Sequence, residues 1–376
     1  MTPLVFRNLT SSKLRTAAAC GGVGVCTLLV LVQLGFYQAA LDGATAIYQT
    51  MDYDAVLVSP SYVCTVESDT IPRRRVVQAL ASPDVAEAIP VYFGLAPWRS
   101  SVSLNKEIMV VVGVEPGQRV FRDPELEAAL LTDLRRADAV FTGRGSQPVV
   151  RSIDPGQAAE MLGKRVRVAG QYEAGPGFLG AGTLVTSLQG FQSVFPTRSL
   201  GEVNVALLRA RSGVDPERMV QGLRALLPDD VRVLTAAELT ALEQEFWREH
   251  AKVQVLFLTG VAVAMLTGLV ILYQILAADV LSRLKEYATL RAMGYDDRRL
   301  SGIVMKQALS LGLLGYAIGF PLALGMYGAT RAATHMNMFM TVTRAGSVLL
   351  GVAVVSAFSA SLATKKLRAA DPAELF

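Results

Sequence analysis

The stretch VQVLFLTGVAVAMLTGLVILYQILAA, Val253 to Ala278, holds no charged side chain and is long enough to cross a lipid bilayer as one α-helix. A bilayer core requires roughly 20 consecutive apolar residues in such a helix. Three further stretches have the same character, Thr16–Leu41, Gln307–Thr330 and Ala345–Thr364. We therefore predict four membrane-spanning helices, one near the start of the sequence and three bunched towards its end.

The composition agrees with a chain that lies largely in a membrane. Mean hydropathy is +0.38, 52% of residues are hydrophobic and 18% are charged, whereas soluble domains average about 25% charged residues. The net charge is only +4, and no Lys/Arg run is interleaved with aromatic residues, which argues against a nucleic-acid partner. Three cysteines are too few for a disulfide framework.

Basic residues flank the apolar stretches at alternate ends, and this pattern sets the orientation of a membrane protein. They precede the first stretch, join the second to the third and follow the fourth: Arg7, Lys13, Arg15, Arg283, Lys285, Arg291, Arg298, Arg299, Lys306, Lys365, Lys366 and Arg368. We predict a multi-pass membrane protein with both termini in the cytoplasm. The long polar segment is then outside the cell; in a double-membrane bacterium the membrane is the inner one and the segment is periplasmic.

The first stretch has a second interpretation, a cleaved signal peptide. A basic segment precedes it, and the small residues Ala39 and Ala40 lie near its end. Signal peptides have apolar cores of about 7–15 residues, and this stretch is longer, so a retained helix is favoured. Sequencing the N-terminus of the mature protein distinguishes the two.

The predicted fold class is an α-helical membrane protein with four transmembrane helices and a large α+β periplasmic domain inserted between the first and second helices. The predicted division is cytoplasmic segment 1–15, helix 16–41, periplasmic domain 42–251, helix 252–278, cytoplasmic loop 279–306, helix 307–330, periplasmic loop 331–344, helix 345–364 and cytoplasmic tail 365–376.

Within 42–251 the pattern predicts two β-α-β halves that pack together, about 42–95 and 200–235, separated by a β-rich insert of about 96–199. Strands are predicted at Tyr53–Ser59, Val85–Phe93, Glu107–Val114, Val203–Arg209 and Val231–Leu234, because β-branched and apolar residues run between turn residues. Helices are predicted at Arg73–Ala81 and Pro216–Leu227, each with proline in or before the first turn.

No catalytic, cofactor or metal site is predicted on the chain. Gly175–Gly180 matches the G-x-G-x-x-G dinucleotide fingerprint, but the β-prone run Thr183–Thr186 follows where that fingerprint needs a helix. We interpret it as a turn between strands. The sequence has no Walker A, H-E-x-x-H or G-x-S-x-G motif, and its two histidines are too few for a histidine metal cluster.

A two-helix stalk is predicted between the large domain and the membrane, at about 236–251. Leu239, Leu242 and Phe246 recur at helical spacing, which indicates an amphipathic helix that runs unbroken into the second span. The first span is expected to extend outward in the same way through Ile47 and Met51. The alternative is a connector packed on the outer domain.

The loop Ser282–Tyr295 is predicted to form a short amphipathic helix, with Gly294 as its C-cap. Basic residues would suit such a helix to the membrane surface. The functional alternative is a docking helix for a cytoplasmic partner.

At these residues the chain resembles the FtsX-like permease family, the membrane subunits of MacB-type (type VII) ABC transporters. Glu286–Tyr295 is similar to the coupling-helix motif of the DevC-like branch. Gln33–Phe36 and Asp52–Leu57 fit the same branch, and Asp371–Glu374 matches the usual family ending.

The resemblance implies a homodimer served by two copies of a separate cytoplasmic ABC ATPase subunit, which binds the ATP and Mg. It also implies a periplasmic adaptor (membrane fusion) protein and a TolC-like outer-membrane channel. MacB carries its ATPase on the same chain, and this sequence does not. The residues expected to contact the ATPase are Leu284, Glu286, Tyr287, Leu290, Arg291 and Met293.

Two functions follow from this resemblance. The first is a permease subunit that transmits ATPase motion across the membrane through its stalk, a process called mechanotransmission, and exports a lipid, glycolipid or other amphiphile. The second is an FtsX-like or lipoprotein-release-type mechanical transmitter that is not itself an exporter. A membrane enzyme is the weakest reading, because the spans hold only isolated polar residues, Gln33, Gln274 and Gln307.

Overall fold

The computed structural model describes residues 13–100, 106–144, 155–172, 181–250, 252–284, 286, 287, 289, 293, 296–334, 336 and 338–369. The chain forms two compact units. We call residues 39–253 with 331–337 the sheet unit, and residues 1–38, 254–330 and 338–376 the helical unit.

The sheet unit is organised around one long strand, β3 (Val85–Ser100). Its first half pairs antiparallel with β10 (Val205–Ala210), with Val205 opposite Val91. β10 in turn pairs with β1 (Ala55–Val58), and β1 with the edge strand β11 (Arg232–Thr235). The two predicted β-α-β halves therefore pack into one sheet, as the sequence indicated.

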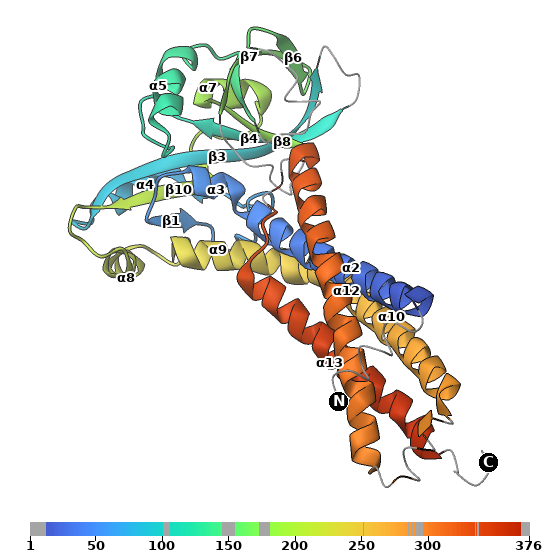
Figure 1. The fold of residues 1–376 in the computed structure, drawn as a ribbon. Helices are drawn as coiled ribbons and strands as arrows, with labels where there is room; N and C mark the ends of the chain where they lie inside the picture. The colour runs from blue at the N-terminus through green and yellow to red at the C-terminus, as the bar shows by residue number, and fades with distance from the viewer. Residues whose placement is uncertain are drawn as a thin grey trace. The chain divides into compact units, whose positions relative to one another are not determined.

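The second half of β3 belongs to a closed barrel (Figure 1). From β3 the order runs β4, β8, β5, β7 and β6, and β6 pairs back onto Trp98–Ser100 of β3. The sequence placed the boundary between the first β-α-β half and the β-rich insert at residues 95 and 96. This boundary falls inside β3, because the strand belongs to both the sheet and the barrel. The other barrel strands are β4 (Glu107–Val114), β5 (Ala139–Gly143), β6 (Ala158–Met161), β7 (Lys164–Tyr172) and β8 (Gly182–Ser187).

Short helices and one small ribbon complete the sheet unit. Capping side chains start three of the helices: Asp123 accepts from the Glu125 N–H, Ser187 from the Gly190 N–H, and Thr235 forms a capping box with Glu238. The elements are α3 (Ala46–Thr50), β2 (Ile71–Pro72), α4 (Arg73–Ala79), α5 (Pro124–Asp133), α7 (Leu188–Val194), β9 (Glu202–Val203), α8 (Pro216–Leu226) and α9 (Ala236–Glu245).

In the described part of the chain, the helical unit contains four helices long and apolar enough to cross a membrane. They are α2 (Lys13–Ala44), α10 (Val253–Ser282), α12 (Asp297–Thr334) and α13 (Val342–Ala369). Their most apolar windows have mean hydropathies of 2.1, 2.6, 1.7 and 1.9. Each covers one of the four stretches singled out in the sequence. α2 is a single helix whose last residues enter the sheet unit.

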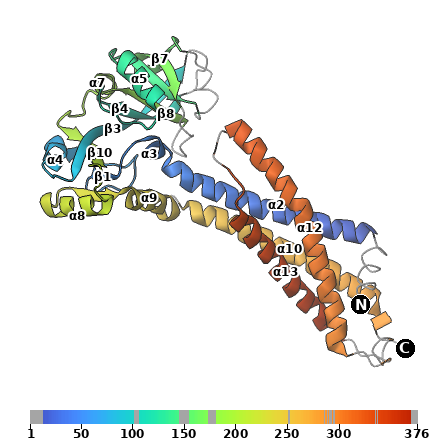
Figure 2. The same cartoon turned by 60° about the vertical axis from the view of Figure 1, so that its left-hand side comes forward.

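Glycines bring α2 into close contact with α12. A Cβ at Gly319 would collide with the carbonyl oxygen of Gly24, and one at Gly315 would lie 2.5 Å from Val23 Cγ1. Small residues four apart let two membrane helices approach until their backbones touch. α2 also lies alongside α10 (Figures 1 and 2), where a Cβ at Gly260 would lie 2.5 Å from the amide nitrogen of Gln33.

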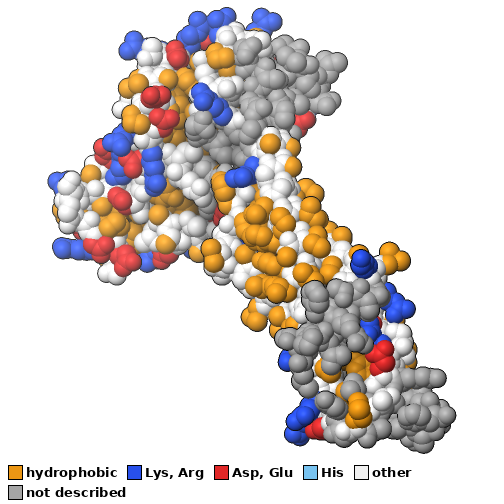
Figure 3. Space-filling view, in the orientation of Figure 1, with side chains coloured by type: hydrophobic (Ala, Val, Ile, Leu, Met, Phe, Trp, Pro, Cys, Tyr) orange, Lys and Arg blue, Asp and Glu red, His pale blue; other side chains and the backbone are white. Residues whose placement is uncertain are grey.

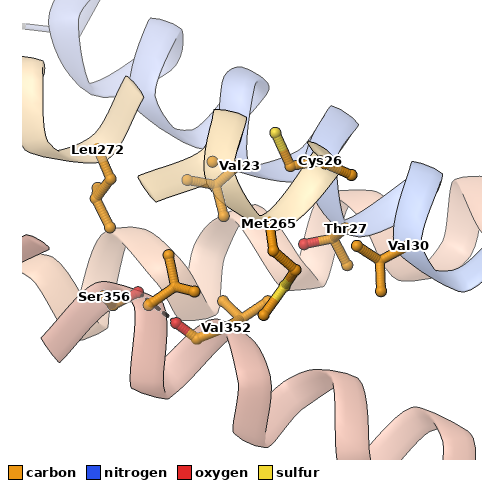
Figure 4. A pocket seen from close by; sticks show the side chains of 11 residues that line it. Val23, Cys26, Thr27, Val30, Met265, Leu272, Val352 and Ser356 are labelled. Atoms are coloured by element: carbon orange, nitrogen blue, oxygen red, sulfur yellow. Dashed lines mark hydrogen bonds between the residues drawn. The ribbon is translucent and has the colours of Figure 1, made fainter. Parts of the chain in front are cut away.

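One small cavity interrupts the packing where α2, α10 and α13 meet (Figure 4). Its volume is about 20 Å³, room for about one water molecule. Thr27 lines it, is 1% exposed, and its hydroxyl has no hydrogen-bond partner among the described residues. The hydroxyl of Ser356, in contrast, donates to the Val352 carbonyl. The buried Thr27 hydroxyl has therefore lost its hydrogen bonds to water without gaining one from the described residues, which is destabilising.

The outer surface of these helices is apolar. Figure 3 shows hydrophobic side chains spread over the helices, with charged residues towards their lower ends and on the sheet unit. Large exposed apolar side chains include Val255, Leu256, Val263 and Leu266 of α10, Leu313, Leu314, Ile318 and Leu322 of α12, and Leu350, Val354 and Phe358 of α13. A surface of this kind suits lipid or another apolar helix.

Candidate functional site

The loop between α10 and α12 starts from a buried polar cluster. Asp279 in the last turn of α10 and Gln307 in α12 are each 5% exposed, and Gln307 Nε2 donates to Asp279 Oδ2 at 2.9 Å. Arg283 follows Asp279 by one helical turn, and its Nε donates to Asp279 Oδ1 at 3.2 Å. Both oxygens of the carboxylate are thus engaged, one by each side of the loop.

This cluster fixes how the two helices are joined. A buried carboxylate is stable only when its charge is paired and its oxygens are hydrogen-bonded. Removing one partner of such a pair typically costs about 3–5 kcal/mol. The prediction that Gln307 is an isolated polar residue is therefore wrong, because α12 begins at Asp297 and carries Gln307 opposite Asp279.

Tyr287 anchors the loop itself. Its side chain is 5% exposed and belongs to a core that includes Val280 of α10 and Ile303 of α12. Burial, and then the nearby Asp279 carboxylate, raise the pKa of Tyr287 to about 12. Two backbone bonds of α-helical type, Tyr287 N–H to the Arg283 carbonyl and Met293 N–H to the Thr289 carbonyl, support the predicted helical turns in this loop.

The residues predicted to contact an ATPase have different environments. Glu286 and Met293 are exposed, the side chain of Glu286 to 64% and Met293 to 63%, and Leu284 is partly buried. Tyr287 was expected in the apolar contact, but its ring is covered by its own chain and acts as an anchor. Leu290 and Arg291 lie outside the described residues, as does the glycine-rich turn at 175–180.

The prediction of an unbroken helix from the large domain into the second span is wrong. α9 ends at Glu245, a π-helical turn covers Phe246–His250, and Lys252 has a left-handed φ of +52° before α10 begins at Val253. A left-handed residue ends the regular hydrogen bonding of a helix.

The apolar stripe of the predicted stalk is used for packing inside the sheet unit. Leu239 is 1% exposed, Met51 0% and Ile47 7%, all in one core, and Leu242 packs against that core. Phe246 begins the π-helical turn and makes an edge-on contact with Trp247. The packed connector, kept as the alternative in the sequence, is what the structure contains.

A buried glutamate lies on the same helix. Glu243 of α9 is 0% exposed, and its Oε1 accepts hydrogen bonds from the hydroxyls of Tyr62 at 2.5 Å and Thr65 at 2.8 Å. The Tyr48 and Tyr62 hydroxyls are 2.8 Å apart and extend the chain of hydrogen bonds. Burial is the largest influence on this carboxyl and raises the pKa of Glu243 to about 7.

Sequence reasoning missed Glu243 and Asp279. Glu243 follows Leu239 by four residues and so lies on the same helix face as the predicted apolar stripe. Asp279 directly follows the apolar stretch and precedes Arg283 by four, which is ion-pair spacing. Both positions were visible in the spacing, but no pattern marked their partners Tyr62, Thr65 and Gln307.

No curated protein sequence matches the chain at a significant level. The periplasmic region of MacB from Actinobacillus actinomycetemcomitans is similar in structure to 54% of this chain, over 96% of its own length, at 8% identity and a TM-score of 0.35. The extracellular domain of the noncanonic ABC-type transporter YknZ from Gram-positive bacteria is similar to 49%, over 100% of its own length, at 11% identity and a TM-score of 0.34. At the C-terminal end, residues 258–372 match the family described as FtsX-like permease C-terminal.

Proposed function

We propose that this chain is the membrane subunit of an ATP-driven complex of the MacB type and that it transmits the motion of a separate ATPase across the bilayer. The match of residues 258–372 to the FtsX-like permease C-terminal family and the four apolar helices support the proposal. The observation that carries it is the Asp279–Gln307 contact, which ties both sides of the cytoplasmic loop together.

The loop between α10 and α12 is suited to pass a displacement by a bound partner to both helices. Its ends are joined through Asp279, and Tyr287 is anchored in the helix core. Glu286 and Met293 remain exposed beside these anchors. A partner that binds the exposed side chains would therefore displace α10 and α12 as a pair instead of bending the loop.

The route from α12 onward runs through α2. Gly315 and Gly319 hold α12 against Val23, Gly24 and Thr27, so a shift of α12 is passed to α2 by direct backbone contact. A helix keeps its backbone hydrogen bonds internal and therefore stays intact within lipid. α2 continues unbroken to Ala44, and α3 after it is buried in the sheet unit through Ile47 and Tyr48. The continuous rod of this proposal is α2, not α9 with α10.

The remaining parts of the proposal follow from charge and from the family resemblance. The chain lies in the bacterial inner membrane with both termini and the loop in the cytoplasm and the sheet unit in the periplasm. It works as a homodimer of the DevC-like branch with two ATPase subunits, which bind ATP and Mg. A periplasmic adaptor and a TolC-like channel complete a pump whose cargo is a lipid, glycolipid or other amphiphile.

The second candidate function is a mechanical transmitter without export, as in FtsX-like or lipoprotein-release systems. The matched family description, FtsX-like permease C-terminal, specifies no cargo and is therefore compatible with a transmitter that exports nothing. Proteins that co-purify with the chain separate the two, because a periplasmic adaptor with an outer-membrane channel supports the pump.

The docking step is tested in a complex of this chain with the ABC ATPase that co-purifies with it, reconstituted in lipid nanodiscs. The chain should raise the ATPase rate, and Met293→Asp or Glu286→Arg should reduce that stimulation at least about tenfold, since a desolvated charge or a reversed ion pair costs roughly 1.4 kcal/mol or more.

The matched control is Glu217→Arg, a charge reversal on the exposed first turn of α8 in the sheet unit. It should leave the stimulation unchanged. The proposal is wrong if no ABC ATPase co-purifies, or if both loop variants stimulate as the unaltered chain does.

A further inference from the structure

Among the described residues, one side of strand β3 is unpaired between its two partner strands β10 and β6. β10 pairs with β3 as far as Val91, and the pairing of β6 with β3 begins only at Trp98. Between these residues β3 pairs with β4 on one side, and no described strand pairs with it on the other. This side of β3 is therefore left without a described partner strand over about 20 Å, at roughly 3.3 Å per residue.

The backbone groups at this gap face outward. Alternate residues of an antiparallel strand direct their N–H and C=O to the same side. The Phe93 N–H donates to Asn204 Oδ1 at 2.9 Å, so the backbone N–H and C=O of Phe93 are directed away from β4. The backbone groups of Leu95 and Pro97 are directed to the same side, and proline has no N–H that needs a partner there. Leu95 thus offers one N–H and one C=O to the gap.

A cavity of about 220 Å³ lies against this edge, lined in part by Phe93, Gly94 and Leu95. Phe195, directly after α7, forms another part of its wall: a Cβ at Gly94 would lie 2.5 Å from Phe195 Cζ, so only glycine lets the ring lie on the strand. The side chain of Leu95 is 45% exposed and extends the apolar surface.

The facing wall is the loop that contains Thr65, Val66 and Ser68. It is held at both ends. Asn204 Nδ2 donates to the Ser68 carbonyl at 3.2 Å and to the Ser68 hydroxyl at 3.1 Å, and the Thr65 hydroxyl donates to Glu243. The cavity is therefore bounded by fixed elements on two sides, as a preformed binding site requires.

Arg198 is the one cationic side chain among the described residues that line the cavity. Arg198 lies three residues after Phe195, and its backbone N–H donates to the Phe195 carbonyl at 3.1 Å. No side-chain hydrogen bond or ion pair joins its guanidinium to any other residue in the described part of the chain. A guanidinium without a partner in a cavity is a ready ligand for a carboxylate.

We propose that this cavity binds a short extended peptide segment that ends in a carboxylate. The segment pairs with the N–H and C=O of Leu95 as an added strand, its carboxylate binds Arg198, and an apolar side chain packs against Phe195 and Val66. Strand addition to an open edge takes its affinity from main-chain hydrogen bonds and its specificity from adjacent side-chain contacts. The site goes beyond the transmission function and does not depend on it.

The test uses the full chain in lipid nanodiscs without any ATPase, so its result is separate from that of the docking experiment. Three probes share one sequence, acetyl-Val-Ala-Leu: the free carboxylate, the C-terminal amide, and a carboxylate form methylated on every backbone nitrogen. Binding is measured by saturation-transfer NMR, with chain-free nanodiscs as background.

The carboxylate peptide should bind saturably. The amide should bind at least about tenfold more weakly, because it loses a charge-assisted bond. The methylated peptide should weaken at least as much, because it cannot donate to the Leu95 carbonyl. Arg198→Gln should make carboxylate and amide bind alike, whereas Arg135→Gln, an exposed arginine away from the cavity lining, should preserve their difference.

Three results would overturn the proposal. The first is no saturable binding above chain-free nanodiscs. The second is equal binding of carboxylate and amide to the unaltered chain. The third is binding of the methylated peptide as tight as that of its parent, which would assign the cavity to a free anion and remove the strand edge from the site.

Discussion

Glu243→Gln should make the sheet unit more stable at neutral pH. The carboxyl of Glu243 is 0% exposed, and its Oε2 has no hydrogen-bond partner among the described residues. A glutamine of the same shape keeps the Oε1 that accepts from Tyr62 and Thr65. It replaces a group that ionises near neutrality with one that stays neutral.

The magnitude follows from the pKa of Glu243, which burial raises from the usual 4.5 to about 7. At about 1.4 kcal/mol per pH unit, the difference corresponds to about 3 kcal/mol. A carboxyl whose folded pKa is raised binds its proton more tightly in the folded state. The free energy of unfolding is therefore highest below pH 4.5, falls as the pH rises towards 7, and is constant above.

The other groups around Glu243 do not titrate in this window. Burial raises the pKa values of Tyr48 and Tyr62 well above their usual range, that of Tyr53 to about 12 and that of Cys64 to about 11. All four side chains are thus neutral from pH 5 to pH 8. The pH dependence that the substitution removes therefore belongs to Glu243 and not to these four side chains.

Urea unfolding followed by tryptophan fluorescence provides the measurement. Both tryptophans, Trp98 and Trp247, lie in the sheet unit and are buried, so the emission reports this unit. From pH 5 to pH 8 the unaltered chain should lose roughly 2–3 kcal/mol more stability than Glu243→Gln. Glu245→Gln, an exposed glutamate on the same helix, should behave like the unaltered chain. Equal losses in the unaltered chain and Glu243→Gln would refute the reasoning.

Three further substitutions test the helical unit in nanodiscs, each by detergent-induced unfolding followed by circular dichroism. Thr27→Val should stabilise by about 1 kcal/mol because it removes an unpaired hydroxyl, whereas Thr267→Val, whose hydroxyl donates to a backbone carbonyl, should not. Gly319→Ala should destabilise by about 1–3 kcal/mol through its clash with α2, and Gly325→Ala, with open space around it, should not. Gln307→Leu should cost about 1.5–3 kcal/mol because a buried carboxylate oxygen loses its donor. If a control variant changed stability as much as its test variant, the role given to the corresponding contact would be wrong.

Elements with a strong local pattern were predictable from the sequence. The four long apolar helices were predictable from length and apolar content alone, and Pro216 marked the start of α8. β4 was predicted with the bounds that it has, Glu107–Val114, because turn residues limit its β-branched run.

Features that depend on tertiary partners were not predictable. The helical stripe of Leu239 and Leu242 is the same whether the helix stands exposed or packs on a core, so periodicity alone did not decide between stalk and connector. The left-handed turn at Lys252 has no glycine or proline to mark it. β3 joins the sheet to the barrel through pairings distant in sequence, which local patterns do not encode.

The central claim is that ATP hydrolysed in the cytoplasm moves the sheet unit through α2. It is tested by pulsed electron paramagnetic resonance on the reconstituted complex, with a spin label at Glu217→Cys on both copies and the cysteines at 20, 26 and 64 replaced by alanine. ATP should change the distance between the two labels, and a Gly-Gly insertion after Gln38 in α2 should abolish that change. A distance that ATP leaves unaltered while the chain still stimulates hydrolysis would contradict the account.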